Sequence, residues 1–140
     1  MAHTCSTLVL HCIDFRLGNA IKEYLEKNNY LGDCDIVSVA GAAKNIASPA
    51  DTSARVFVLN QIAISKRLHN ISRVVLMNHT DCGAYGGTSA FASDEAEKEH
   101  HRSEMMSART IIHELHPELN ISLALAHVAH DNVRIEAIEA

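Results

Sequence analysis

Short apolar runs alternate with longer amphipathic segments along the 140 residues, and this alternation constrains the fold more than any other feature. Continuous apolar runs are typical of strands buried on both faces of a parallel sheet. The last run instead alternates apolar and polar residues, as a half-exposed edge strand does. Five strands are therefore predicted, at residues 7–12, 35–40, 72–78, 121–128 and 132–139.

Helices are predicted between these strands. The first covers residues 17–29, and its buried face consists of Leu17, Ile21, Tyr24 and Leu25. The second is expected to begin at Ser48 as the N-cap, with Pro49 in the first position and Asp51 completing a capping box. Its predicted buried face consists of Val56, Leu59, Ile62 and Ala63.

A third, long helix is predicted from a cap at Ser93 to His116, where Pro117 stops it. Its first turn is acidic (Asp94, Glu95 and Glu97), which complements the helix dipole. Met105 and Ile112 on this helix are expected in the core or at a dimer contact.

This order of elements predicts an α/β fold. Its mostly parallel sheet has four strands in the order 2-1-3-4, an antiparallel fifth strand at the edge, and helices on both faces. No linker or repeat divides the chain, so residues 1–140 are interpreted as a single domain. Because strands two and three lie on opposite sides of strand one, ligands are expected beyond the carboxyl ends of strands one and three.

Charge and composition limit the partners. The formal charge of −5 argues against a nucleic-acid partner, and no apolar run approaches the roughly 20 residues that span a bilayer. The first residues, MAHTCS, lack the pattern of a secretory signal. We therefore expect a cytoplasmic protein without a membrane partner, whose four cysteines are reduced thiols or metal ligands.

Two polar motifs stand where the first and third strands end. LHCIDFR covers residues 10–16 and NHTDCG covers residues 78–83. Cys12, His79 and Cys82 supply two thiolates and one imidazole, a zinc ligand set that leaves a fourth position for water, as catalytic sites do. The alternative is that the two thiols are buried as small apolar residues, which is the better interpretation for either cysteine alone.

Asp14 and Arg16 follow Cys12 at alternate positions, so the three side chains project to one side of an extended segment. Asp14 can accept a hydrogen bond from hydroxide, and Arg16 can hold Asp14 by a paired, charge-assisted bond. That pairing keeps the carboxylate ionised and away from the zinc. The alternative is a purely structural ion pair.

The segments Cys12-Ile-Asp14-Phe-Arg16 and His79-Thr-Asp-Cys82-Gly83 resemble the paired signatures of the β-class carbonic anhydrases. The resemblance runs from about residue 7 to the C-terminus. It implies that Cys12, His79 and Cys82 bind Zn²⁺, that Asp14 and Arg16 form the catalytic dyad, and that the chain forms a homodimer or a higher homo-oligomer. The implied reaction is the reversible hydration of CO₂ to bicarbonate and a proton.

The chain departs from that family at several places. Phe15 stands where a serine is usual, only the last two residues of Ser38–Gly41 match the family's arginine-asparagine-alanine-glycine stretch, and the family's N-terminal helices are missing. Two alternative functions therefore stay open. One is hydrolysis of carbonyl sulfide or carbon disulfide at the same zinc, and the other is a non-catalytic zinc-binding module.

Other polar residues have simpler interpretations. Cys5 and Cys34 are expected to be core or surface thiols, and Asp81 is expected to cap the turn that follows it. The glycine-rich residues 83–87 favour a flexible loop over a phosphate cradle, because no Walker lysine follows. The histidines of the long helix are expected to be solvated, namely His100, His101 and His113.

Overall fold

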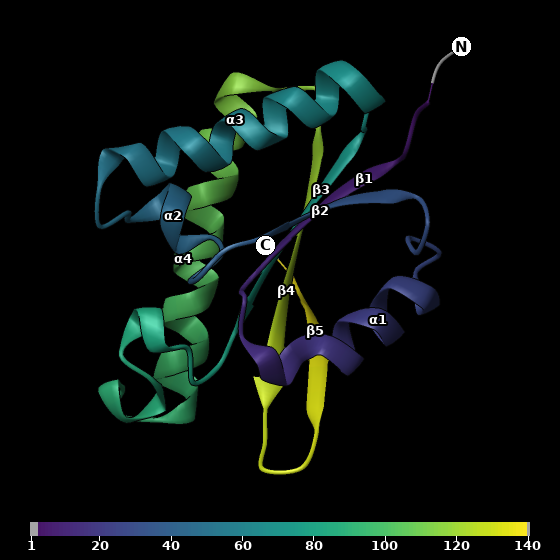
Figure 1. Ribbon diagram of the computed structural model, residues 1–140. Helices are drawn as coiled ribbons and strands as arrows, with labels where there is room; N and C mark the ends of the chain where they lie inside the picture. The colour runs from purple at the N-terminus through teal and green to yellow at the C-terminus, as the bar shows by residue number, and fades with distance from the viewer. Residues whose placement is uncertain (1–2, 140) are drawn as a thin grey trace.

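The computed structural model describes residues 3–139 and contains one five-stranded sheet (Figure 1). The strands are β1 (Thr7–His11), β2 (Cys34–Ser38), β3 (Arg73–His79), β4 (Asn120–Val128) and β5 (Val133–Ile138). Their order is β2-β1-β3-β4-β5, with parallel pairing throughout except between β4 and β5. The predicted fold class and strand order are confirmed.

Helices cover both faces of the sheet, as predicted. They are α1 (Gly18–Lys27), α2 (Lys44–Ala47), α3 (Thr52–His69) and α4 (Asp94–Leu115). Three short 3-10 turns add to them, at Phe15–Leu17, Gly83–Tyr85 and Thr88–Ala90. In Figure 1, α2, α3 and α4 lie on one side of the sheet and α1 lies on the other, and each side has its own buried apolar cluster.

The start of α3 was predicted wrongly. Asp51 is its N-cap and accepts a hydrogen bond from the Ser53 backbone N–H at 2.8 Å, whereas Ser48 ends the short helix α2. The predicted buried face was partly wrong. Ile62 is buried and Leu59 packs against the core as predicted, but Val56 is 62% exposed and Val58, which was not predicted, is buried. Apolar residues surround α3 on nearly every side, so periodicity could not select the face that packs.

The long helix α4 begins at the predicted cap, where Ser93 Oγ accepts from the Ala96 backbone N–H at 3.0 Å. Met105 and Ile112 lie in the core. His101, which was expected in solvent, is fully buried, while His100 and His113 are exposed. The reason is position, because His101 lies one turn before Met105 on the buried stripe of the helix.

No helix within residues 3–139 is long and apolar enough to cross a bilayer.

Candidate metal centre

The two motifs meet beyond the carboxyl ends of β1 and β3, where the topology places a ligand site. Cys12 follows β1, His79 is the last residue of β3, and Cys82 caps the next 3-10 turn. All three side chains are buried. Their ligand atoms, two sulfurs and one imidazole nitrogen, lie within 4.8 Å of one another. The structure thus brings together the three residues predicted as zinc ligands.

Two backbone features build this convergence. Asp81 adopts a left-handed conformation (φ 55°), which turns the chain between His79 and Cys82. Gly41 also has positive φ (80°), and a Cβ there would approach the Ala84 side chain to 3.0 Å. Its backbone N–H points at Cys12 Sγ at 3.5 Å. The position therefore favours glycine, and this backbone donor helps to stabilise a thiolate.

The protonation pattern of His79 suits a metal ligand. Its Nδ1 lies 2.6 Å from the Thr80 carbonyl oxygen, which can only accept, so Nδ1 carries the proton. The Nε2 lone pair is therefore free, and within the described part of the chain this buried atom has no hydrogen-bond partner. A buried, unpartnered acceptor beside two thiols is costly unless a cation fills the space. The donor set fits a borderline-soft ion such as Zn²⁺.

The two thiols are poised to ionise. The hydrogen bond with Cys82 lowers the pKa of Cys12 to about 3, even though burial opposes ionisation. The same hydrogen bond, together with burial, raises the pKa of Cys82. The pair therefore gives up its first proton easily, and a cation would be needed to remove the second.

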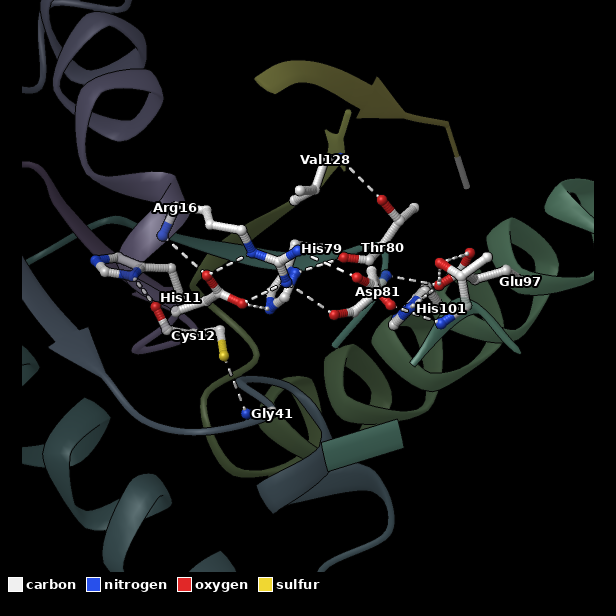
Figure 2. A network of polar contacts seen from close by, with 12 residues as sticks. His11, Cys12, Arg16, Gly41, His79, Thr80, Asp81, Glu97, His101 and Val128 are labelled. Atoms are coloured by element: carbon white, nitrogen blue, oxygen red, sulfur yellow. Dashed lines mark hydrogen bonds and ion pairs between the residues drawn. The ribbon is translucent and has the colours of Figure 1, made fainter. Parts of the chain in front are cut away.

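Arg16 joins the two motifs through a fork of hydrogen bonds (Figure 2). Its Nε and Nη2 donate to the two carboxylate oxygens of Asp14 at 3.0 and 2.7 Å. Its Nη1 donates to Asp81 Oδ2 at 3.1 Å, and Nη2 also donates to the Asp81 carbonyl oxygen at 3.0 Å. The predicted Asp14–Arg16 pair is present, and Asp81 is a third member that the sequence did not indicate.

Asp14 lies beside the three candidate ligands. Its Oδ2 is 3.8 Å from His79 Nε2. The hydrogen bonds from Arg16 lower the pKa of Asp14 to about 2, against the effect of burial. Asp14 is therefore a carboxylate at neutral pH, fixed by Arg16 beside His79.

Asp81 does not cap the 3-10 turn Gly83–Tyr85 that follows it, as was predicted, because no side chain among the described residues caps that turn. Its Oδ1 instead accepts from the Thr88 backbone N–H at 2.9 Å. Its own N–H donates to Glu97 Oε2 at 2.8 Å, and Thr88 Oγ1 donates to the same carboxylate at 3.1 Å. Glu97 is only 2% exposed, so it is an anchor for the loop after β3 as well as part of an acidic helix start.

Asn78 holds a second buried network behind the site. Its Oδ1 accepts from the Ala43 backbone N–H, and its Nδ2 donates to Tyr85 Oη and His101 Nδ1, each at 3.1 Å. Tyr85 Oη in turn donates to Glu104 Oε1 at 3.1 Å. These bonds fix the last residues of β3 against α4. Sequence reasoning missed this network because its members are distant along the chain.

Comparison with known proteins agrees with this geometry. Residues 2–139 match the protein family described as "Putative carbonic anhydrase". A protein of Rickettsia bellii is 32% identical over 119 residues, covering 83% of this chain and 73% of that protein. A protein of Rickettsia conorii is 31% identical over 119 residues, covering 83% of this chain and 64% of that protein. Both are described only as uncharacterized.

Two solved structures share the fold. The carbonic anhydrase of Streptococcus mutans superposes with a TM-score of 0.56 at 24% identity, covering 96% of this chain and 82% of that chain. The beta-carbonic anhydrase isoform I of Trichomonas vaginalis gives a TM-score of 0.63 at 13% identity, covering 96% and 83%.

Proposed function

The chain belongs to the carbonic anhydrase family that its sequence matches, and on this premise we propose that it catalyses the zinc-dependent, reversible hydration of CO₂ to bicarbonate. One observation carries the proposal. Three buried ligand atoms of Cys12, His79 and Cys82 converge, and the ionised carboxylate of Asp14 lies beside them. In this proposal the first three residues hold Zn²⁺, while Asp14 and Arg16 are the catalytic pair.

Zinc held by these ligands would act as a Lewis acid that lowers the pKa of water, so that hydroxide is available near neutral pH. Asp14, ionised because Arg16 stabilises its charged form, would accept a hydrogen bond from the attacking oxygen nucleophile and so orient it toward the carbon of CO₂. Arg16 keeps both Asp14 oxygens engaged, and its bonds to Asp81 fix the guanidinium in turn. The chain's contribution is thus orientation and a fixed negative charge.

A second substrate class is favoured by one feature. Phe15 lies between Asp14 and Arg16 in the chain and is 91% exposed, so an apolar residue stands next to the proposed catalytic pair in sequence, where the β-class family usually has a serine. Carbonyl sulfide and carbon disulfide are larger, more lipophilic analogues of CO₂ that the same chemistry can hydrolyse. The proposal keeps CO₂ as substrate and these analogues as the alternative.

Assays of the zinc-loaded protein against CO₂, carbonyl sulfide and carbon disulfide distinguish these functions. We expect the highest kcat/KM with CO₂. A higher kcat/KM with a sulfur analogue would show that this analogue, and not CO₂, is the substrate. If the fully zinc-loaded protein turned over none of the three compounds, it would be a non-catalytic zinc-binding module.

We also propose a cytoplasmic homodimer with the site near its interface. Ile13 and Phe15, which flank Asp14, are 62% and 91% exposed, and contact with a second copy would remove this apolar surface from water. A reducing compartment would keep the thiol ligands available. Sedimentation at micromolar concentration should give a dimer, and a monomer with full activity would contradict this proposal.

A further inference from the structure

A second group of metal-binding side chains lies at the amino-terminal end of the sheet, outside the candidate metal centre. Cys5 precedes β1, Asp35 lies in β2, and His69 is the last residue of α3. One ligand atom from each lies within 4.8 Å of the other two. None of the three has a part in the proposed reaction. We propose that Cys5, Asp35 and His69 form a second site for a divalent transition metal of the Zn²⁺ class.

The backbone fixes this convergence. The Cys5 N–H donates to the His69 carbonyl oxygen at 3.1 Å, which holds the segment before β1 against the end of α3. Asn70, in a left-handed conformation (φ 53°), ends that helix immediately after His69. The parallel register pairs Leu8 with Asp35, so the carboxylate lies on the face of the sheet that α3 covers. The three side chains therefore meet because of the ladder and the helix end.

The local chemistry suits a metal of this class. A thiolate, an imidazole and a carboxylate are all zinc ligands, and the thiolate disfavours hard ions such as Mg²⁺ and Ca²⁺. His69 Nδ1 lies 2.6 Å from Asp35 Oδ2, and Ser65 Oγ donates to the same oxygen at 2.5 Å. The side chains of Asp35 and His69 are 30% and 34% exposed, which leaves an ion a path from solvent.

The pKa values of Cys5 and Asp35 are shifted in opposite directions. Burial and the neighbouring Asp35 raise the pKa of Cys5, so the thiol stays protonated when no cation is present. Burial opposes the charged form of Asp35, but hydrogen bonds from Ser65 and His69 outweigh it and lower its pKa.

The competing interpretation is a hydrogen-bonded strut, in which Asp35 simply ties His69 and Ser65 to β2. A strut does not require a cysteine. Cys34 provides a matched comparison, because it pairs with Thr7 at the start of β1 yet packs on the opposite face of the sheet, with the cluster around Val9. It shares the residue type and the neighbourhood of Cys5 but not the ligand geometry.

This site would act structurally. Seven residue steps, most of them along β1, lead from Cys5 to Cys12 in the candidate metal centre, a chain distance of up to about 23 Å at ~3.3 Å per residue. A metal there would tie the segment before β1 to β2 and α3. The ring of His3 lies edge-on to that of His69, with centroids 6.1 Å apart.

Titration of the metal-free full-length protein with Co²⁺ tests the proposal, with the thiolate-to-cobalt absorption band and bound metal as readouts. Wild type and Cys34→Ser should each bind two equivalents, and Cys5→Ser should bind one. His69→Gln should also bind one, because glutamine keeps an N–H donor for Asp35 but is a poor ligand for this class of metal. The Cys12→Ser/Cys82→Ser double variant should retain one equivalent, which separates this site from the catalytic proposal.

Thermal unfolding gives a second readout. Filling the second equivalent should raise the melting temperature of wild type and of Cys34→Ser but not of Cys5→Ser. A single equivalent in wild type that Cys5→Ser leaves unchanged would overturn the proposal. Two equivalents in both Cys5→Ser and His69→Gln would overturn it as well.

Discussion

Replacing Arg16 by alanine should abolish most hydration activity without releasing zinc. The variant retains the backbone N–H bond to Asp14 but loses two charge-assisted side-chain bonds to its carboxylate, at 3.0 and 2.7 Å. Such bonds contribute about 1.5–3 kcal/mol each, and partial exposure of Arg16 reduces this, so we expect a loss of ~3 kcal/mol in transition-state stabilisation. That energy corresponds to a fall of about 10²-fold in kcat.

The freed Asp14 carboxylate should then bind the zinc itself. Its Oδ2 is already 3.8 Å from His79 Nε2, and coordination to a dication is the best remaining option for an anion without its cation. Stopped-flow hydration, zinc analysis and X-ray absorption of Arg16→Ala should therefore show low activity, wild-type zinc content and an additional carboxylate ligand. Asp14→Ala should also retain zinc but leave the fourth position open.

Arg102→Ala provides the matched control, because among residues 3–139 the Arg102 side chain bonds to Glu99 and to the Glu139 carbonyl oxygen, both at the surface. The Asp14→Ala/Arg16→Ala double variant should be little worse than the worse single variant, since the two residues act as one unit. Activity near wild type in Arg16→Ala, with an unchanged metal environment, would refute the reasoning and leave the pair as a structural ion pair.

Two further predictions concern the buried residues of α4. Burial lowers the pKa of His101 from 6.5 to about 4, and nearby histidine charges add to this effect. The unfolded chain therefore binds the proton first, so stability should be full above pH 6.5 and fall by roughly 3 kcal/mol on acidification to pH 4. Urea unfolding across this pH range should show that the unfolding free energy of His101→Gln falls less than that of wild type, while that of the exposed His113→Gln falls as much as wild type. An equal fall in all three proteins would contradict the role of His101. Glu97→Ala should lower the unfolding free energy by about 1–3 kcal/mol, because it leaves the Asp81 N–H without an acceptor, whereas Glu97→Gln keeps one. Equal stability of the two Glu97 variants by urea unfolding would exclude that role.

The positions of the strands could be predicted because each short apolar run fits a buried strand better than a helix. Their order could be predicted because helices alternate with these strands along the chain. Residues 72–78 are uniformly apolar apart from their ends, and β3 occupies Arg73–His79 with all but its first residue buried. The start of α3 was less determined, because Ser48 and Asp51 are both good N-caps. Ser48 lies at the end of α2, a four-residue helix too short to show periodicity, so Asp51 remained to cap α3.

In the candidate site, residues in short motifs could be predicted, whereas residues placed by the packing of distant elements could not. Cys12, His79 and Cys82 could be identified because their residue types and spacing are restrictive, and the strand order brings them together. Asp81, Glu97 and the Asn78 network depend on which helix packs behind β3, and no single stretch of sequence contains that information. The burial of His101 follows from the same packing.

Hydration of CO₂ by zinc-loaded Cys82→Ser, beside wild type and Cys34→Ser, tests the central claim most directly. Stopped-flow rates and metal analysis should be collected on the same preparations. We expect Cys34→Ser to match wild type in activity and zinc content, while Cys82→Ser loses one equivalent of zinc and essentially all activity. Full zinc content and full activity in Cys82→Ser would contradict the assignment of the metal centre.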